Sequence, residues 1–166
     1  MSKWLLRGVV FATAMVIVRL VQGALINATP SKSLLISVVL LVVFSIGVAF
    51  WALLDGRADA RRTPDPDRRT DLSMTWLGAG LCAGVLSGLV SWFISLFYKA
   101  IYAESLLNEV TTFAAFTALL TFLVAVAFAT LGRWMVDRHA PPVTRHGTHG
   151  EDRADTQPRV AALRRA

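Results

Sequence analysis

The chain has 166 residues, of which 55% are hydrophobic, and its mean hydropathy is +0.55. A soluble domain of this length needs more polar residues to cover its surface. The net charge is +6, but the basic residues lie between hydrophobic runs and near the C-terminus, and none adjoins an aromatic platform or a nucleic-acid-binding motif. These features predict a membrane protein and no nucleic-acid partner.

Four segments are long and hydrophobic enough to cross a bilayer, which takes roughly 20 residues of helix. We predict spans at about residues 8–28, 34–54, 72–98 and 111–131. Lys3, Trp4 and Arg7 precede the first span as an interfacial anchor, and no small-residue cleavage site follows it, so we expect it to be retained. The predicted fold class is therefore an all-α membrane protein, with four transmembrane helices arranged as two antiparallel hairpins.

The segment between the second and third spans, residues 55–71, contains five Asp, five Arg and two Pro, so we expect it to lie in water. Asp71 or Ser73 can cap the third helix. Because the acidic and basic side chains balance, the segment lacks the uncompensated positive charge that attracts anionic lipid. We interpret it as an internally paired capping or docking loop.

Basic residues are unevenly distributed about the four spans. Fourteen of the 17 Lys and Arg precede the first span, lie in the 55–71 segment or follow from Arg133 onward, whereas only Lys32 and Lys99 lie in the other connections. The positive-inside rule then predicts an N-in/C-in protein of the cell inner (plasma) membrane. Residues 1–138 are the predicted transmembrane domain. Residues 139–166, rich in Pro, Gly, Thr and Arg, are predicted to be a disordered basic cytoplasmic tail.

Small residues recur along one face of the third span, at Gly80, Gly84, Gly88, Ser91 and Ser95. Steps of three and four residues place them on one stripe of a helix. Because lipid provides little hydrophobic drive for helix association, such a stripe favours close contact between backbones. We predict a helix-packing interface here, either within the bundle of this chain or with another subunit.

Arg19 lies about eleven residues into the first span, where a charged side chain costs at least roughly 2.5 to 3.5 kcal/mol on insertion scales. Gln22 and Asn27 continue a polar strip toward the outer leaflet, and Glu109 lies on that side of the membrane. We predict that these four residues form a buried polar patch. It either clamps two helices together, with Glu109 as the partner of Arg19, or faces a lipid headgroup or substrate.

The four spans lack the groups of residues that catalyse reactions or bind cofactors in membrane enzymes. None carries the Ser–His–Asp sets, Cys pairs or clustered His and carboxylates of membrane enzymes, so we expect no enzyme activity, catalytic residue or cofactor. His146 and His149 lack the further ligands and rigid frame of a metal site. Two functions stay open, an accessory subunit of a larger assembly and a standalone transporter. For a transporter, the spans of this chain lack the buried carboxylate that couples small multidrug transporters to protons.

Four stretches, LVQGALIN, DGRADARRTPDPDRRTDLSMTWL, NEVTTFAAFTALL and LGRWMVDR, resemble the actinobacterial four-helix membrane proteins labelled B-4DMT family transporter. The likeness covers about residues 1–138. Mycobacterial members resemble LucB-like accessory subunits of Mce lipid importers. The resemblance therefore implies a non-catalytic accessory subunit of an Mce-type importer, with membrane lipids and permease subunits as partners. The family label implies the alternative, a standalone drug or metabolite transporter.

Overall fold

The computed structural model describes residues 3–97 and 105–140, apart from the side chains of Lys3 and Glu109, and these residues form helices joined by short turns. The elements are α1 (Lys3–Ala28), η1 (Pro30–Lys32), α2 (Ser33–Arg62), η2 (Pro66–Arg68), α3 (Leu72–Ser95), α4 (Leu106–Asn108), the π-helical turn η3 (Glu109–Phe113) and α5 (Ala114–Asp137). Four helical segments are long and apolar enough to cross a membrane. The prediction of an all-helical, multi-pass membrane protein is confirmed.

The helices differ in length from the predicted spans. α2 continues about two turns past residue 54 to Arg62, so the first half of the predicted water-exposed loop is helical. α3 ends at Ser95, and the predicted end of that span, at 98, lies outside the described residues. The fourth span begins earlier than expected, at α4. Of the predicted tail, residues 141–166 also lie outside the described part of the chain.

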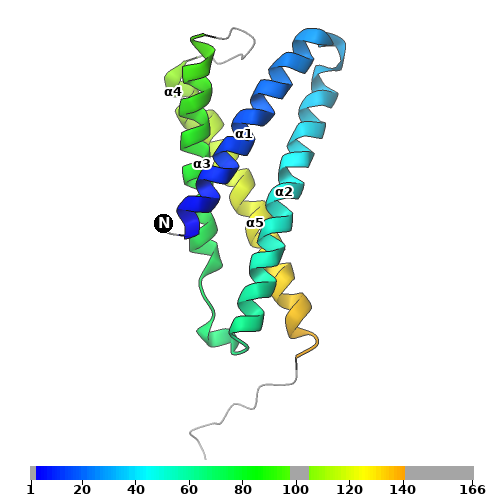
Figure 1. Ribbon diagram of the computed structural model, residues 1–166, viewed down its shortest axis with the longest axis vertical. Coiled ribbons are helices and arrows are strands. Elements are labelled where there is room, and N and C mark those ends of the chain that lie inside the picture. The colour runs from blue at the N-terminus through cyan, green and yellow to red at the C-terminus, as the bar shows by residue number, and fades with distance from the viewer. Residues whose placement is uncertain (1–2, 98–104, 141–166) are drawn as a thin grey trace, which may run out of the picture.

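The four long helices alternate in direction, with α1 and α3 running upward in Figure 1 and α2 and α5 running downward. The connection between α2 and α3 and the C-terminal end of α5 therefore lie at the lower end. α5 packs along both α2 and α3, and α1 packs along α3, whereas α1 and α2 contact each other much less. The most extensive contacts thus include helices that are not neighbours in sequence, and α5 is the central element.

Aromatic side chains fill the space where α1, α2 and α3 meet. The Phe11 ring centre lies 6.0 Å from that of Phe44 and 5.8 Å from those of Trp51 and Trp76. Trp76 is fully buried, and Phe11 is 5% exposed. Edge-on and tilted aromatic pairs of this kind add about 0.5–1.5 kcal/mol each beyond the area that they bury. This cluster attaches α1 to the rest of the bundle.

α2 and α5 approach each other closely through small residues. A Cβ atom added to Gly56 would meet the Ala129 carbonyl, and one added to Gly132 would meet the Leu53 carbonyl. Neither position has room for a methyl group. The two backbones are therefore in direct contact, which is the main way in which transmembrane helices gain packing energy.

We predict that Gly56→Ala destabilises the protein because the added methyl group must push α5 away from α2. Overpacking typically costs about 1–3 kcal/mol. Gly47→Ala in the same helix is the matched control, since a Cβ atom there would meet nothing within 4 Å and alanine favours helix by up to about 1 kcal/mol. Thermal unfolding in detergent, followed by circular dichroism, measures both. Equal midpoints for the two variants would contradict the contact.

Candidate functional site

The predicted small-residue interface of α3 faces α5 of the same chain. Gly80, Gly84, Gly88 and Ser91 are all buried. A Cβ atom on Gly80 would lie 2.8 Å from the Ala118 carbonyl oxygen, and one on Gly84 would meet the Ala114 carbonyl. Ser95 is only partly buried, and its hydroxyl donates to the Trp92 carbonyl at 2.6 Å. Of the two alternatives left open by the sequence, the described residues place the stripe within the bundle.

α5 supplies a small-residue face that packs against α3 near its start and against α2 near its end, and sequence analysis missed it. Its buried residues are all small: Ala114, Thr117, Ala118, Thr121, Ala125, Ala129 and Gly132. They recur at three- and four-residue steps over five turns, which is the same signal that identified the stripe on α3. Alanine and threonine carry most of this face, so a search for glycine repeats does not find it.

The predicted polar patch is a groove between α1, α2 and the start of α5. The guanidinium carbon of Arg19 lies 4.1 Å from the ring centre of Phe113, a cation–π contact. Gln22 donates to the Ser37 hydroxyl at 2.8 Å and links α1 to α2. The groove has a volume of about 360 Å³, and its walls are Met15, Val18, Arg19, Gln22, Ser37, Val38, Leu41, Phe113 and Phe116. A cation and an amide therefore face a largely apolar space.

The other two residues of the predicted patch have different outcomes. Asn27 is exposed near the end of α1 and does not line the groove. The side chain of Glu109 lies outside the described part of the structure, so its ion pair with Arg19 stays a prediction. The backbone of Glu109 opens the π-helical turn η3, which ends at Phe113. Such wide turns often occur at functional sites, and this one carries the ring that Arg19 contacts.

Ion pairs join the helices at the lower end of the bundle. Nη2 of Arg7 on α1 lies 2.7 Å from Oδ2 of Asp55 on α2, and this guanidinium also lies 5.4 Å from the centre of the buried Trp76 ring. Nη2 of Arg133 on α5 donates to Oδ2 of Asp59 on α2 at 2.6 Å. Both pairs are largely buried. They fix α2 to its neighbours on two sides.

The α2–α3 connection is also held by arginine. Both terminal nitrogens of Arg69 donate to the Asp137 carboxylate, at 2.7 and 2.6 Å. Arg133 reaches the connection as well, donating to the Thr70 carbonyl at 2.6 Å. We call the three ion pairs Arg7–Asp55, Arg133–Asp59 and Arg69–Asp137 the charged clamp.

The end of the connection caps α3. The Asp71 carboxylate accepts from the backbone N–H groups of Ser73 and Met74, at 2.9 and 3.2 Å. Asp71 is thus the N-cap, one of the two candidates that the sequence offered. With the clamp and this cap, the connection is internally paired over the bundle end.

We predict that Arg133→Gln and Asp59→Asn each lower the free energy of unfolding by about 1–3 kcal/mol, because each leaves a partly desolvated charge unpaired. The double variant should lose less than the sum, since an amide pair retains a hydrogen bond. Arg68→Gln is the control. The Arg68 side chain is 84% exposed and lies 3.6 Å from Asp65, and such surface pairs contribute about 0–1 kcal/mol. Additive losses in the unfolding measurement would show that the Arg133–Asp59 pair is not coupled.

Comparison with known proteins adds no relative: no protein-family model and no curated protein matches the chain. The resemblance to B-4DMT family members therefore rests on the sequence motifs alone.

Proposed function

We propose that this chain is a non-catalytic accessory subunit of a multi-subunit Mce-type lipid importer and binds its permease through transmembrane helices. The motifs that resemble LucB-like subunits support the choice of assembly. The observation that supports a subunit role is the outward surface of α2, which is apolar and is left exposed by the residues that the structure describes.

α1 and α2 are the least covered helices of the bundle. Within the most hydrophobic stretch of each candidate span, 22% of the α1 stretch and 17% of the α2 stretch are buried. The corresponding shares are 39% for the span that contains α3 and 33% for the span that contains α5. The outer face of α2 is a continuous row of exposed large side chains: Leu34, Leu35, Val38, Val39, Val42, Val43, Ile46 and Phe50. In a membrane this face contacts lipid or another helix.

A partner helix has a specific place to pack. The upper half of α2 contributes no residue to the buried core before Phe44, and the groove with Arg19 and Gln22 opens between α1 and α2. A helix lying along this half of α2 would fill the groove and gain van der Waals contacts that disordered acyl chains supply less completely. The small-residue stripes cannot serve this purpose because they are used inside the bundle.

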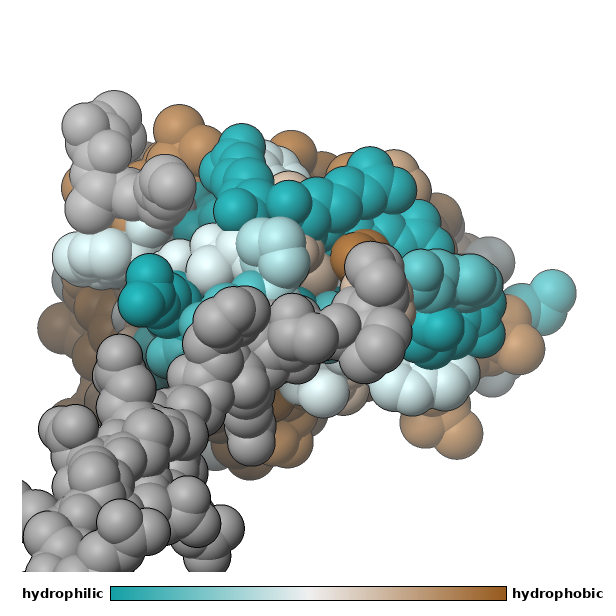
Figure 2. Space-filling view, turned by 90° about the horizontal axis from the view of Figure 1, so that it is seen from below, coloured by the Kyte–Doolittle hydropathy of each residue, from teal (hydrophilic) through white to brown (hydrophobic). Residues whose placement is uncertain are grey.

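We further propose that both termini and the clamp face the cytoplasm. The support is the bias of 14 basic residues against two, counted along the sequence. Figure 2 views the lower end of the bundle, where hydrophilic side chains gather while hydrophobic side chains cover the flanks. Such an end suits the water side of a membrane.

The groove also favours a second candidate, a standalone small drug or metabolite transporter. The groove lies in the half of the bundle away from the clamp, so the arrangement resembles a cavity closed at one end. Uptake of a substrate by vesicles that contain this protein alone would support the transporter and contradict the accessory role.

We predict that the tagged protein, extracted from its native membrane in mild detergent, retains permease subunits that mass spectrometry identifies. Val43→Trp should reduce their recovery several-fold, because a bulky ring on the outer face of α2 blocks a partner helix. Leu123→Trp on α5 is the matched control, since Leu123 is 56% exposed and Val43 is 58% exposed. An unmodified protein that carries no companion subunits would exclude the proposal.

Cysteine labelling in intact cells, in a Cys82→Ser background, tests the predicted orientation. Ser31→Cys, in the turn η1, should react with a membrane-impermeant reagent. Thr70→Cys, an exposed position in the α2–α3 connection, should react only after lysis. The reverse pattern would place the termini outside.

A further inference from the structure

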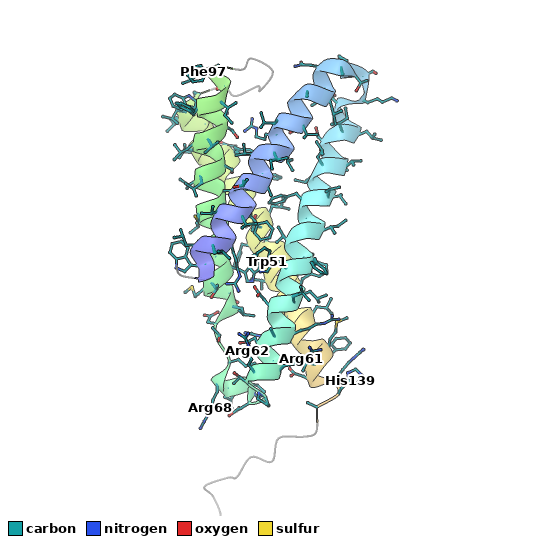
Figure 3. All side chains as sticks on the ribbon, viewed as in Figure 1. Trp51, Arg61, Arg62, Arg68, Phe97 and His139 are labelled. Carbon is teal, nitrogen blue, oxygen red and sulfur yellow. The ribbon has the colours of Figure 1, made fainter. Side chains whose placement is uncertain are left out.

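A basic pocket lies where α2 and α5 end. It has a volume of about 570 Å³ and is lined by Arg57, Arg61, Met135, Val136, Arg138, His139 and Ala140. Figure 3 shows Arg61 and His139 near the C-terminal end of α5, whereas Arg68 projects away on the opposite side of the bundle end. Three guanidinium groups thus share one concave surface.

Five carboxylates at this end of the bundle are engaged elsewhere. Asp55, Asp59 and Asp137 belong to the charged clamp, Asp71 caps α3, and Asp65 pairs with Arg68. Equal numbers of Asp and Arg in residues 55–71 therefore do not mean mutual neutralisation. Asp55 and Asp59 pair with Arg7 of α1 and Arg133 of α5 rather than with the arginines of their own segment.

The arginines of the pocket have weak partners or none within the described residues. Nη2 of Arg57 donates to the Met135 sulfur at 3.0 Å, and a thioether is a weak acceptor. Arg138 lies over the Trp134 ring, with its guanidinium carbon 5.0 Å from the ring centre. Arg61 makes no ion pair or hydrogen bond with any part of the chain that the structure describes. This side of the bundle end therefore carries unbalanced positive charge.

The pocket lies at the depth of lipid headgroups. Arg57 and Arg61 follow Leu54, the last residue of the apolar run of α2, by three and seven residues, which is about 4.5 and 10 Å along a helix. The headgroup layer on each side of a bilayer is roughly 5–8 Å thick, so the Arg57 backbone falls within it and the Arg61 backbone just beyond it. Side chains on a helix tilt toward its N-terminus, which directs Arg61 back toward the headgroups. Trp134 is 54% exposed one turn before Arg138, as expected of an aromatic ring at the membrane interface.

Apolar side chains continue from the pocket toward the membrane interior. Leu54 lies one turn before Arg57 on the same face of α2, and Leu131 lies two turns before Arg138 on α5. Both are partly exposed, at 46% and 38%. A ligand with a charged head and a hydrocarbon chain would meet matching surface at both ends.

We propose that this pocket binds the phosphate of an anionic phospholipid from the leaflet on the side of the termini. Guanidinium groups suit phosphate because their planar N–H forks donate in pairs. The C-terminal ends of α2 and α5 carry partial negative charge, so the arginine side chains rather than backbone groups hold the anion. This proposed lipid site does not depend on whether the protein is an accessory subunit or a standalone transporter.

The test measures lipid binding to the full-length protein in detergent by native mass spectrometry. Phosphatidylglycerol and phosphatidylcholine with the same acyl chains are the probes. The unmodified protein should retain phosphatidylglycerol preferentially. Each of Arg57→Gln, Arg61→Gln and Arg138→Gln should weaken phosphatidylglycerol binding roughly fivefold, the contribution of one basic residue near a membrane surface, and leave phosphatidylcholine unchanged.

Arg68→Gln is the matched control because it removes the same charge at a side chain that is 84% exposed and lies outside the pocket. An equally large loss of phosphatidylglycerol binding in Arg68→Gln would show that the effect comes from overall charge, and it would contradict the proposed site. Displacement of the lipid by millimolar inorganic phosphate would assign the pocket to free phosphate instead. Because Arg61 has no partner among the described residues, Arg61→Gln should keep the unmodified unfolding midpoint, so its lipid binding tests the site without a folding defect.

Discussion

Direct backbone contact of α5 with two neighbouring helices determines the rest of the structure. Gly56 and Gly132 bring α2 against α5, and Gly80 and Gly84 bring α3 against it. In lipid, where apolar side chains gain little by leaving their surroundings, these contacts supply much of the packing energy. α1 then rests on α3, where a Cβ atom on Gly8 would lie 2.7 Å from that of Cys82. In the part of the chain that the structure describes, the upper half of α2 has no buried residue before Phe44, and the groove lies beside it.

The same contact organises the charges at the end of the bundle. Where α2 and α5 touch, Asp59 comes within 2.6 Å of Arg133, and both helices end soon afterwards, at Arg62 and Asp137. Asp55 and Asp59 point toward the interior, where Arg7 of α1 and Arg133 of α5 neutralise them. Arg57 and Arg61 lie elsewhere on the surface of α2 and have no carboxylate partner among the described residues. The basic pocket is therefore a consequence of how the helices pack.

Local features were predictable from the sequence and long-range pairings were not. The spans follow from hydrophobic length, and the cap at Asp71 follows from its place before an apolar run. The stripe beginning at Gly80 follows from helical spacing. The contact of Asp59 with Arg133 joins residues 74 apart, and a count of charges says nothing about which carboxylate reaches which helix. The contact of Arg19 with the Phe113 ring likewise joins residues 94 apart, and the spacing of polar residues along α1 does not indicate an aromatic partner.

The clamp bears on the choice between a subunit and a transporter. Alternating access would require the lower end to open while the upper end closes around the groove. Opening must separate the contacts of Gly56 with Ala129 and of Gly132 with Leu53 and break the Arg133–Asp59 pair together, since all lie on the same stretch of α2 and α5. Breaking this partly buried pair adds about 1–3 kcal/mol to that cost. Unless an energy source drives that opening, the bundle stays closed at this end, which suits a rigid subunit better than a carrier.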